Sequence, residues 1–262
     1  MDNTTRTPAV AGIFYPDNTH ELSTMIDQFL QSVKTTGQVP KAIIVPHAGY
    51  VYSGPVAASA YALIRPARDK IKRVILLGPS HKIPLLGLAT TNAQNFSTPF
   101  GEVPIDRKAI YSITKFPQVS IMEQAHANEH SLEVQLPFLQ KILDQFSIVP
   151  LAVGKATTEQ VGEILEALWG NEETLIIISS DLSHYNNYKV AQELDKLTTQ
   201  AIETLSPEKI EHEQACGRVA INGLLHIAKI RKMQVKTIDV RNSGDTAGSK
   251  DQVVGYGAYA FN

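Results

Sequence analysis

Three histidines of this sequence each follow a short run of apolar residues, which puts groups able to bind a metal at comparable positions. The runs and their histidines are 42–45 with His47, 73–77 with His81, and 174–178 with His184. Short aliphatic runs that close on glycine, proline or serine are typical of buried strands rather than helices. In open α/β sheets, ligands bind outside the carboxyl ends of the strands, where side chains from separate strands can converge. The sequence therefore predicts one site that several strands share.

The chemistry expected at this site is metal binding. Two neutral imidazoles and one carboxylate form the facial triad of non-haem Fe(II) oxygenases, and imidazole also suits copper and zinc. We expect His47 and His81 as the imidazole ligands and Asp245, in a polar turn after a late strand, as the carboxylate. Fe(II) is then the expected cofactor, with copper or zinc as alternatives. The competing interpretation is that the histidines are structural and that Asp245 only shapes its turn.

His184 is the expected catalytic histidine. It lies three residues after Asp181 in the stretch Ser179-Ser-Asp-Leu-Ser-His. Histidine titrates near neutral pH, so a histidine beside a metal-bound substrate can act as a general acid or base, while Asp181 orients or tunes its ring. The alternatives are that His184 is a third metal ligand and that Asp181 only caps a helix.

Four further side chains are expected to contact a substrate in the crevice. Tyr50 and Tyr52 come just after His47, and they could donate hydrogen bonds or simply pack. His130 and Glu133 fall in a helix expected from residue 129 to residue 143, kinked or restarted at Pro137. Glu133 is otherwise a residue of the polar face of that helix.

A competing metal motif is the H-x-x-E-H pattern at residues 126–130, which is found in one class of zinc metalloproteases. Within a helix, both histidines would share a face and Glu129 could act as a base, which would make the protein a zinc hydrolase. The motif falls at the start of the expected helix rather than inside it, and this position argues against the hydrolase.

The single cysteine, Cys216, cannot form an internal disulfide. We expect it inside a helical tract that runs from Pro207 through Ala228, with no histidine and aspartate partners nearby in sequence. It is therefore interpreted as a buried structural residue.

The elements that must position these residues alternate as in a largely parallel α/β sheet. Strands are expected at 42–45, 73–78, 147–153, 174–180, 235–240 and 253–261. Helices are expected after an Asn18 cap to residue 33, and at 55–64, 106–114, 129–143, 158–169, 188–205 and 207–228. Residues 84–105 should form a β-hairpin or an irregular excursion. Because no linker is visible, we expect one domain over residues 1–262.

The composition excludes several classes of protein. Hydrophobic residues make up 43% and charged residues 19%, which is ordinary for a globular protein and excludes a disordered or fibrous one. The formal net charge of −2 comes from scattered charges, so we expect neither nucleic acid nor a membrane as a partner. The polar first residues contain no apolar signal region, and together with the single cysteine they predict a cytoplasmic location.

Six stretches of this sequence resemble the Memo family, whose prokaryotic members are called AmmeMemoRadiSam system protein B. These stretches are Pro8-Ala-Val-Ala-Gly-Ile-Phe-Tyr-Pro, Pro46-His-Ala-Gly-Tyr-Val-Tyr-Ser-Gly, Leu77-Gly-Pro-Ser-His, Glu129-His-Ser-Leu-Glu-Val-Gln-Leu-Pro-Phe-Leu, Ser179-Ser-Asp-Leu-Ser-His and Val253-Val-Gly-Tyr. The family is similar to the class III extradiol dioxygenases, which implies a single α/β domain with a non-haem iron site. The resemblance implies His47 and His81 as imidazole ligands and His184 as the catalytic histidine.

The relatives that carry this resemblance differ in their third metal ligand. The animal member of the family has a cysteine near the position of Asp245, whereas the dioxygenases use a glutamate; thiolate favours copper(I) and carboxylate favours iron. The function expected is that of a metal-dependent redox protein, an oxygenase acting on a small aromatic molecule or a modified residue. The rival expectation is a non-catalytic module that binds a peptide or small anion through His47, His81 and Tyr52.

Overall fold

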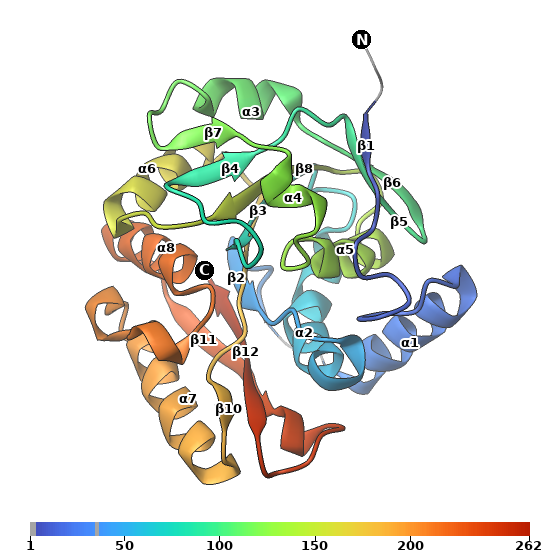
Figure 1. Ribbon diagram of the computed structural model, residues 1–262, viewed down its shortest axis with the longest axis vertical. Coiled ribbons are helices and arrows are strands. Elements are labelled where there is room, and N and C mark those ends of the chain that lie inside the picture. Colours follow the sequence, from blue (N-terminus) through green and yellow to red (C-terminus); the bar gives the residue numbers. More distant parts are fainter. Residues whose placement is uncertain (1–3, 35–36) are drawn as a thin grey trace.

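A mixed central sheet runs through the computed structural model of the protein, which describes residues 4–34 and 37–262 (Figure 1). Across this sheet, the strands are β10 (His184–Asn186), β12 (Val253–Phe261), β2 (Ala42–Val45), β9 (Thr174–Ser179), β3 (Arg73–Pro79), β8 (Ser147–Val153), β4 (Leu88–Thr90) and β7 (Val119–Ile121), and β11 (Val235–Asn242) pairs with β12. β2, β9, β3 and β8 are parallel, whereas β12 and β4 run antiparallel to their inner neighbours. The predicted α/β domain with a mixed sheet is confirmed, and its centre is parallel.

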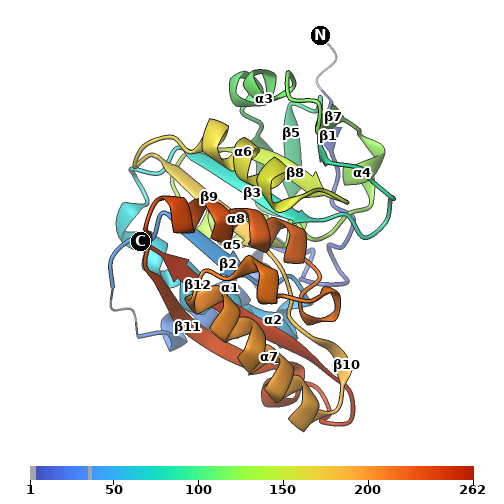
Figure 2. The same ribbon diagram turned by 90° about the vertical axis from the view of Figure 1, so that its left-hand side faces the viewer.

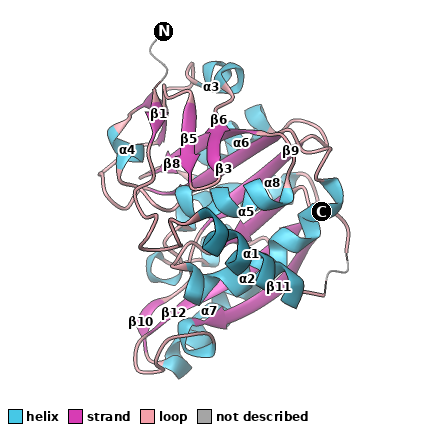
Figure 3. Cartoon of the chain, turned by 90° about the vertical axis from the view of Figure 1, so that its right-hand side faces the viewer, coloured by secondary structure: helices cyan, strands magenta, loops and turns pink. Residues whose placement is uncertain are grey.

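Helices cover both faces of this sheet. Figure 2 shows α6 (Thr158–Leu168), α7 (Tyr188–Glu203) and α8 (Arg218–Ile230) on one face. Figure 3 shows α1 (Thr19–Ser32), α2 (Tyr50–Ile64) and α5 (Leu136–Ile142) on the other. Shorter elements complete the fold: a three-stranded sheet of β1 (Thr5–Arg6), β5 (Asn95–Thr98) and β6 (Gly101–Pro104), the helices α3 (Arg107–Ile113) and α4 (Gln124–Ala127), and the 3-10 turns η1 (Arg65–Ala67), η2 (Glu133–Gln135), η3 (Pro207–Lys209), η4 (His212–Gln214) and η5 (Ser243–Asp245). No helix of the described part of the chain has the length and apolar character needed to cross a membrane.

The sequence explains why the central strands and several helices form. Every residue of β2 and β9 is buried, as expected for parallel strands that are covered by helices on both faces. Asn18 caps α1, because its side chain accepts hydrogen bonds from the backbone N–H groups of His20 and Glu21. Thr157 and Gln160 form a capping box at the start of α6. These elements begin and end close to their predicted bounds.

The helix predicted to start at Pro55 begins five residues earlier, at Tyr50. Pro55 therefore lies inside α2 and Ser53 is not its cap. A proline at this position removes only the helical hydrogen bond to the carbonyl of Val51, and that residue is 51% exposed, so water can reach the first turn. The helix consequently starts three residues after His47 instead of eight.

The prediction of one helix over 207–228 is wrong for the first half of this range. There the chain forms η3, η4 and a turn, and α8 begins only at Arg218. The backbone at Gly217 lies so close to the end of β9 that an added Cβ would meet Ser180 Cβ at 2.6 Å. Ser180 Oγ also accepts a hydrogen bond from the N–H of Gly217 at 2.9 Å. This tertiary contact overrides the helical pattern, and it puts Cys216 in the turn immediately before α8.

Two other parts of the chain also differ from the sequence-based expectation. The segment from 129 to 143 forms a turn, η2 and then α5, with Pro137 in the first turn of α5, so the proline marks a restart. The stretch 84–105 contains the expected hairpin, formed by β5 and β6, and also β4 of the central sheet. The short strands β4, β7 and β10 were not predicted, because a strand of three residues is too short to show an alternating pattern of apolar and polar residues.

Candidate metal centre

The carboxyl ends of three neighbouring parallel strands meet at one edge of the central sheet. His47, His81 and Asp181 each lie two residues beyond the last residue of β2, β3 and β9, respectively. Because β9 lies between β2 and β3, these residues come together, and the ring centroids of His47 and His81 are 5.3 Å apart. The structure thus brings the two histidines into one site as predicted, while their binding of a metal stays a prediction.

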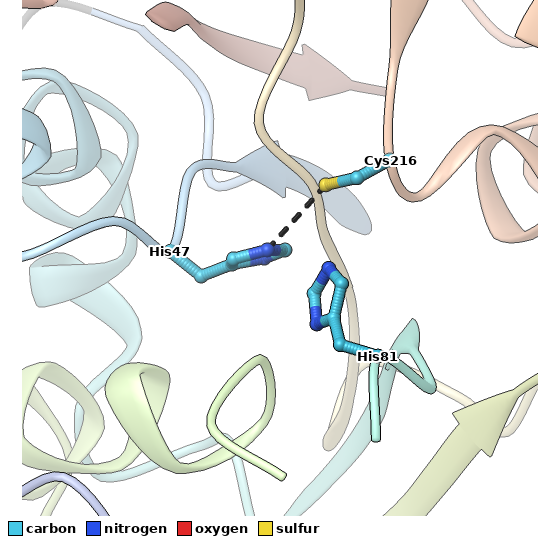
Figure 4. Close-up of side chains that lie close together, drawn as sticks. All are labelled: His47, His81 and Cys216. Atoms are coloured by element: carbon cyan, nitrogen blue, oxygen red, sulfur yellow. Dashed lines mark hydrogen bonds between the residues drawn. The ribbon is translucent and has the colours of Figure 1, made fainter. Parts of the chain in front are cut away.

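Cys216 is the third member of this group. Its Sγ lies 3.4 Å from Nε2 of His47, and the candidate ligand atoms of Cys216, His47 and His81 all lie within 4.8 Å of one another (Figure 4). Bond lengths of about 2.1 Å to nitrogen and 2.3 Å to sulfur in a tetrahedral site place ligand atoms roughly 3.3–3.7 Å apart. The three side chains therefore fit a single transition-metal ion with little movement.

Ser179 determines which nitrogen of His47 carries the proton. The single hydroxyl proton of Ser179 is donated to the carbonyl oxygen of Ser131 at 2.6 Å, and the same Oγ accepts a hydrogen bond from Gln135 Nε2 at 2.7 Å. Nδ1 of His47 lies 2.9 Å from this Oγ, so the ring nitrogen must be the donor. The unprotonated Nε2 of His47 consequently faces the sulfur of Cys216.

The orientation of Gln135 is fixed in turn. Its Nε2 donates to the carbonyl oxygen of Pro46 at 2.9 Å, and a carbonyl can only accept. Its Oε1 accepts a hydrogen bond from the hydroxyl of Tyr61 at 2.8 Å. Burial, followed by the neighbouring His81, lowers the pKa of His47 to about 3, so the ring is neutral at neutral pH. A neutral imidazole with a free Nε2 is the form that binds a metal.

Glu129 orients the second imidazole. Its Oε1 lies 3.0 Å from Nδ1 of His81, and its Oε2 accepts the backbone N–H of the same residue at 2.5 Å. Burial alone would raise the pKa of Glu129, but the hydrogen bonds from His81 and from the N–H of Ser131 lower it to about 2. This carboxylate is an acceptor for Nδ1–H, so in the neutral ring the other nitrogen of His81 is the one left without a proton, and Figure 4 shows that nitrogen facing Cys216.

His130 lies beside both imidazoles. Its ring stacks on that of His81, with centroids 4.8 Å apart, and it meets the ring of His47 edge-on at 5.5 Å. Its Nδ1 is 3.4 Å from Glu129 Oε1, so His81, Glu129 and His130 form a second group of candidate ligand atoms. Burial, followed by the charge of His47, lowers the pKa of His130 to about 4. His130 thus belongs to the wall of the site, and its expected contact with a substrate stays a prediction.

Asp181 supports the site from the end of β9. Its Oδ1 accepts the backbone N–H of His47 at 2.8 Å, and its Oδ2 is 4.0 Å from Nε2 of the same residue. Burial raises the pKa of Asp181, and the hydrogen bond from His47 partly offsets this rise. His184 begins β10, is partly exposed, and affects the pKa of both His47 and Asp181 through its charge. Neither residue belongs to the two groups of candidate ligands.

Asp245 belongs to neither group of candidate ligands among the described residues. It is exposed, and its carboxylate accepts hydrogen bonds from the hydroxyl of Tyr188 and from the N–H of Asn242. This is the capping role in a turn that the sequence offered as the alternative. The structure therefore places Cys216, rather than Asp245, beside the imidazoles.

Cys216 is partly buried, and this affects its chemistry. Burial, followed by the charge of Asp181, raises the pKa of the Cys216 thiol to about 12. The thiol is therefore protonated in the absence of a metal, and an ion that binds there must displace its proton. Sequence reasoning missed this residue because a helical pattern was extended across it. The glycine that follows it was the one local sign of a break.

The other three side chains that were expected to contact a substrate lie in different surroundings. Tyr50 is buried and donates to the carbonyl of Val134, so it packs, whereas Tyr52 is 39% exposed. Glu133 is fully buried and accepts hydrogen bonds from Arg6, Tyr15 and the N–H groups of Ala9 and Val10. These bonds occupy the oxygens of Glu133, which anchors the N-terminal segment instead of facing a substrate.

The H-x-x-E-H pattern does not form a metal site in the described structure. His126 is buried, and its Nε2 lies 3.1 Å from the carbonyl oxygen of Ala89. It belongs to neither group of candidate ligands, although Glu129 and His130 of the same pattern belong to the second. The structure therefore gives no support to the zinc hydrolase.

Comparison with known proteins shows the family and the fold of this chain. The family described as Memo-like protein matches residues 6–260. Among similar proteins, a MEMO1 family protein of Aquifex aeolicus is 37% identical, over 96% of this chain and 97% of its own. A MEMO1 family protein of Metallosphaera sedula is 34% identical, over 98% and 99%. Among solved structures, uncharacterized protein JW3007 from Escherichia coli K12 has a TM-score of 0.52 at 11% identity, over 82% of this chain and 98% of that one, and it shares the fold.

Proposed function

Since the chain belongs to the family of Memo-like proteins, we propose that it is a metal-dependent redox protein whose ion is bound by His47, His81 and Cys216. The observation that supports this most is the fixed orientation of the two imidazoles. Ser179 and Glu129 hold the Nδ1 protons, which leaves both Nε2 atoms free beside one thiol. Hydrogen bonds of this kind to the outer nitrogen are typical of histidines that bind metals.

The donor set decides which metal we propose. The expectation of Fe(II) depended on a carboxylate from Asp245, which belongs to neither group of candidate ligands, and the group that contains both predicted histidines offers two nitrogens and one sulfur. Thiolate is a soft ligand that selects copper(I) over Fe(II), so copper replaces iron as the proposed ion. A bound copper ion would supply one-electron redox chemistry. Zinc also suits these donors but has no redox chemistry.

The surrounding side chains have separate roles in this proposal. His184 exchanges protons with a substrate. It is partly exposed, it lies close enough to Asp181 for its charge to affect that carboxyl, and it is not one of the three proposed metal ligands. Asp181 holds the backbone of His47 and thereby the position of the ring. His130 covers the site on the side of His81, so it limits the access of water and of large ligands.

Anaerobic titration of protein purified without a chelator tests the metal. We expect one copper(I) ion per chain, bound more tightly than Fe(II), and we expect Cys216→Ser and His47→Ala to weaken copper binding at least 100-fold. Asp245→Asn is the control and should bind copper as the wild type does. Tighter binding of Fe(II), or equal copper affinity in Cys216→Ser, would contradict the proposal.

Oxygen uptake by the copper-loaded protein with ascorbate tests the redox part. His184→Gln should keep the bound copper while turnover falls by about 10²-fold, which is typical for the loss of a general acid or base. If the wild type binds no metal, the protein is better described by the rival expectation of a binding module. Loss of copper from His184→Gln would make that residue a ligand.

A further inference from the structure

A cavity of about 680 Å³ adjoins the metal centre, and Cys216 forms part of its wall. Cys216 is also the residue whose sulfur lies beside His47, so one side chain connects the cavity to the site. Most of the remaining lining is apolar and comes from residues 83–86, Val153 and residues 219–220. The volume lies within the range of pockets that bind small molecules.

The lysine and the arginine of this cavity are both positive. Lys155 and Arg218 line it together with His212, and no aspartate or glutamate does so in the described structure. Neither Lys155 nor Arg218 is among the ion pairs formed by the described residues. Two cations that form no ion pair among the described residues, in a mostly apolar cavity, favour a ligand that carries negative charge.

The start of α8 adds to this preference. The cap of α8 is Gly217, which offers no side-chain acceptor, and Val219 and Ala220 of the first turn line the cavity. Their backbone N–H groups belong to the first turn of a helix and have no acceptor within it. The first turn, Lys155 and Arg218 therefore act together on the same space.

We propose that this cavity binds the substrate of the metal centre, and that the substrate is a small molecule with an apolar body and one carboxylate or phosphate group. Lys155 and Arg218 bind the anionic group, and the apolar lining near Leu85 holds the body. Cys216 then keeps the bound molecule next to the ion. This inference rests on the proposed function, because it takes Cys216 as a metal ligand.

Calorimetric titration of the copper-loaded protein with three probes tests the assignment. Benzoate and phenyl phosphate carry the two anionic groups, and benzamide is the neutral analogue of benzoate. We expect at least one anion to bind, at least tenfold more tightly than benzamide, with an affinity that falls as salt is added. The stronger of the two anions identifies the group that the site prefers.

Charge-removing variants show where the anion binds. A charge-assisted hydrogen bond is worth enough to change affinity about tenfold. Arg218→Gln, which is partly buried, should therefore weaken binding of the preferred anion about tenfold, and Lys155→Gln, which is exposed, at least threefold. Arg65→Gln and Lys236→Gln remove the same charges outside the cavity and should leave the affinity unchanged.

The outcomes separate this inference from the proposed function. Unchanged anion affinity in both Arg218→Gln and Lys155→Gln, binding of benzamide as tight as that of benzoate, or no binding of either anion would overturn the assignment. The copper content of each variant is measured alongside and should equal that of the wild type. Anion binding by a chain that takes up no metal would overturn the metal centre and support the anion site alone.

Discussion

Ser179 and Glu129 contact the two imidazoles at Nδ1, on the far side of each ring from Cys216. Each provides an acceptor that fixes the Nδ1–H tautomer, one through a neutral hydroxyl and the other through an ionised carboxylate. A carboxylate makes its histidine a more basic ligand than a hydroxyl does. The two imidazoles therefore differ in ligand strength although their ring positions are similar.

Ser179→Ala should lower the copper affinity of the protein 10- to 100-fold, because His47 loses the acceptor that fixes its tautomer. The variant also leaves Gln135 Nε2 with one partner fewer, at a cost of about 1–3 kcal/mol of stability. Competition titration well below the unfolding temperature measures the affinity alone. Ser112→Ala on the exposed face of α3 is the control, and equal affinities in all three proteins would contradict the role of Ser179.

The affinity for metal should rise with pH because of the Cys216 thiol. Its pKa is raised to about 12 by burial, so the thiol is protonated throughout the neutral range and releases one proton when metal binds. His47, whose pKa is about 3, is already neutral there and releases none. The logarithm of the association constant should therefore rise by about one per pH unit between about pH 7 and pH 9. Binding that is independent of pH would show that the thiolate is not a ligand.

At the scale of elements, the strands that end at the site were predictable and the turn that carries Cys216 was not. β2, β3 and β9 are apolar runs whose lengths and closing residues identify them. The site residues His47, His81 and Asp181 each lie two residues after the end of one of these strands. The 207–217 segment has a sequence compatible with a helix, yet its packing against Ser180 breaks it. Local sequence does not record such a contact, because Ser180 and Gly217 are 37 residues apart.

α7 supports the connection between β9 and β10 through Asp195. This buried carboxylate accepts the N–H of Ser183 at 3.0 Å, one residue before His184. It also lies so close to Gly255 of β12 that an added Cβ there would meet its Oδ2 at 2.0 Å. Burial raises the pKa of Asp195 to about 6. The charged form of this group is therefore disfavoured in the folded protein.

Asp195→Asn should change how the free energy of unfolding depends on pH. Between about pH 4 and pH 6 the folded chain keeps a proton that the unfolded chain has released, so this group lowers stability as pH rises through that window. The variant should be about 2–3 kcal/mol more stable than the wild type at pH 7, and the difference should vanish below about pH 4. Urea unfolding at both pH values measures it, and parallel pH profiles would contradict the raised pKa.

At the scale of the whole molecule, the site depends on contacts between distant parts of the chain. His47 and Cys216 are 169 residues apart in sequence, and they meet because α8 packs against β9 and β3 while β2 pairs with β9. The shared edge for His47 and His81 followed from general rules for parallel sheets. The choice between Cys216 and Asp245 required the packing of the C-terminal half, which no periodicity in the sequence shows.

The buried pair of Arg6 and Glu133 ties the N-terminal segment to the segment that carries Glu129 and His130. Arg6→Met would leave the charge of Glu133 buried without its partner, which typically costs about 3–5 kcal/mol of stability. Chemical unfolding measures this loss. Arg68→Met removes the same kind of side chain from an exposed pair with Asp144 and should change stability little. Similar losses of stability in the two variants would mean that Arg6 does not stabilise the buried carboxylate of Glu133.

The central claim is that Cys216 and two imidazoles bind the ion, and X-ray absorption at the metal edge tests it most directly. The copper-loaded wild type should show one sulfur neighbour at about 2.3 Å together with nitrogen neighbours from imidazole. The sulfur neighbour should be absent in Cys216→Ser and present in Asp245→Asn. A wild-type spectrum with only nitrogen and oxygen neighbours, unchanged in Cys216→Ser, would contradict the account.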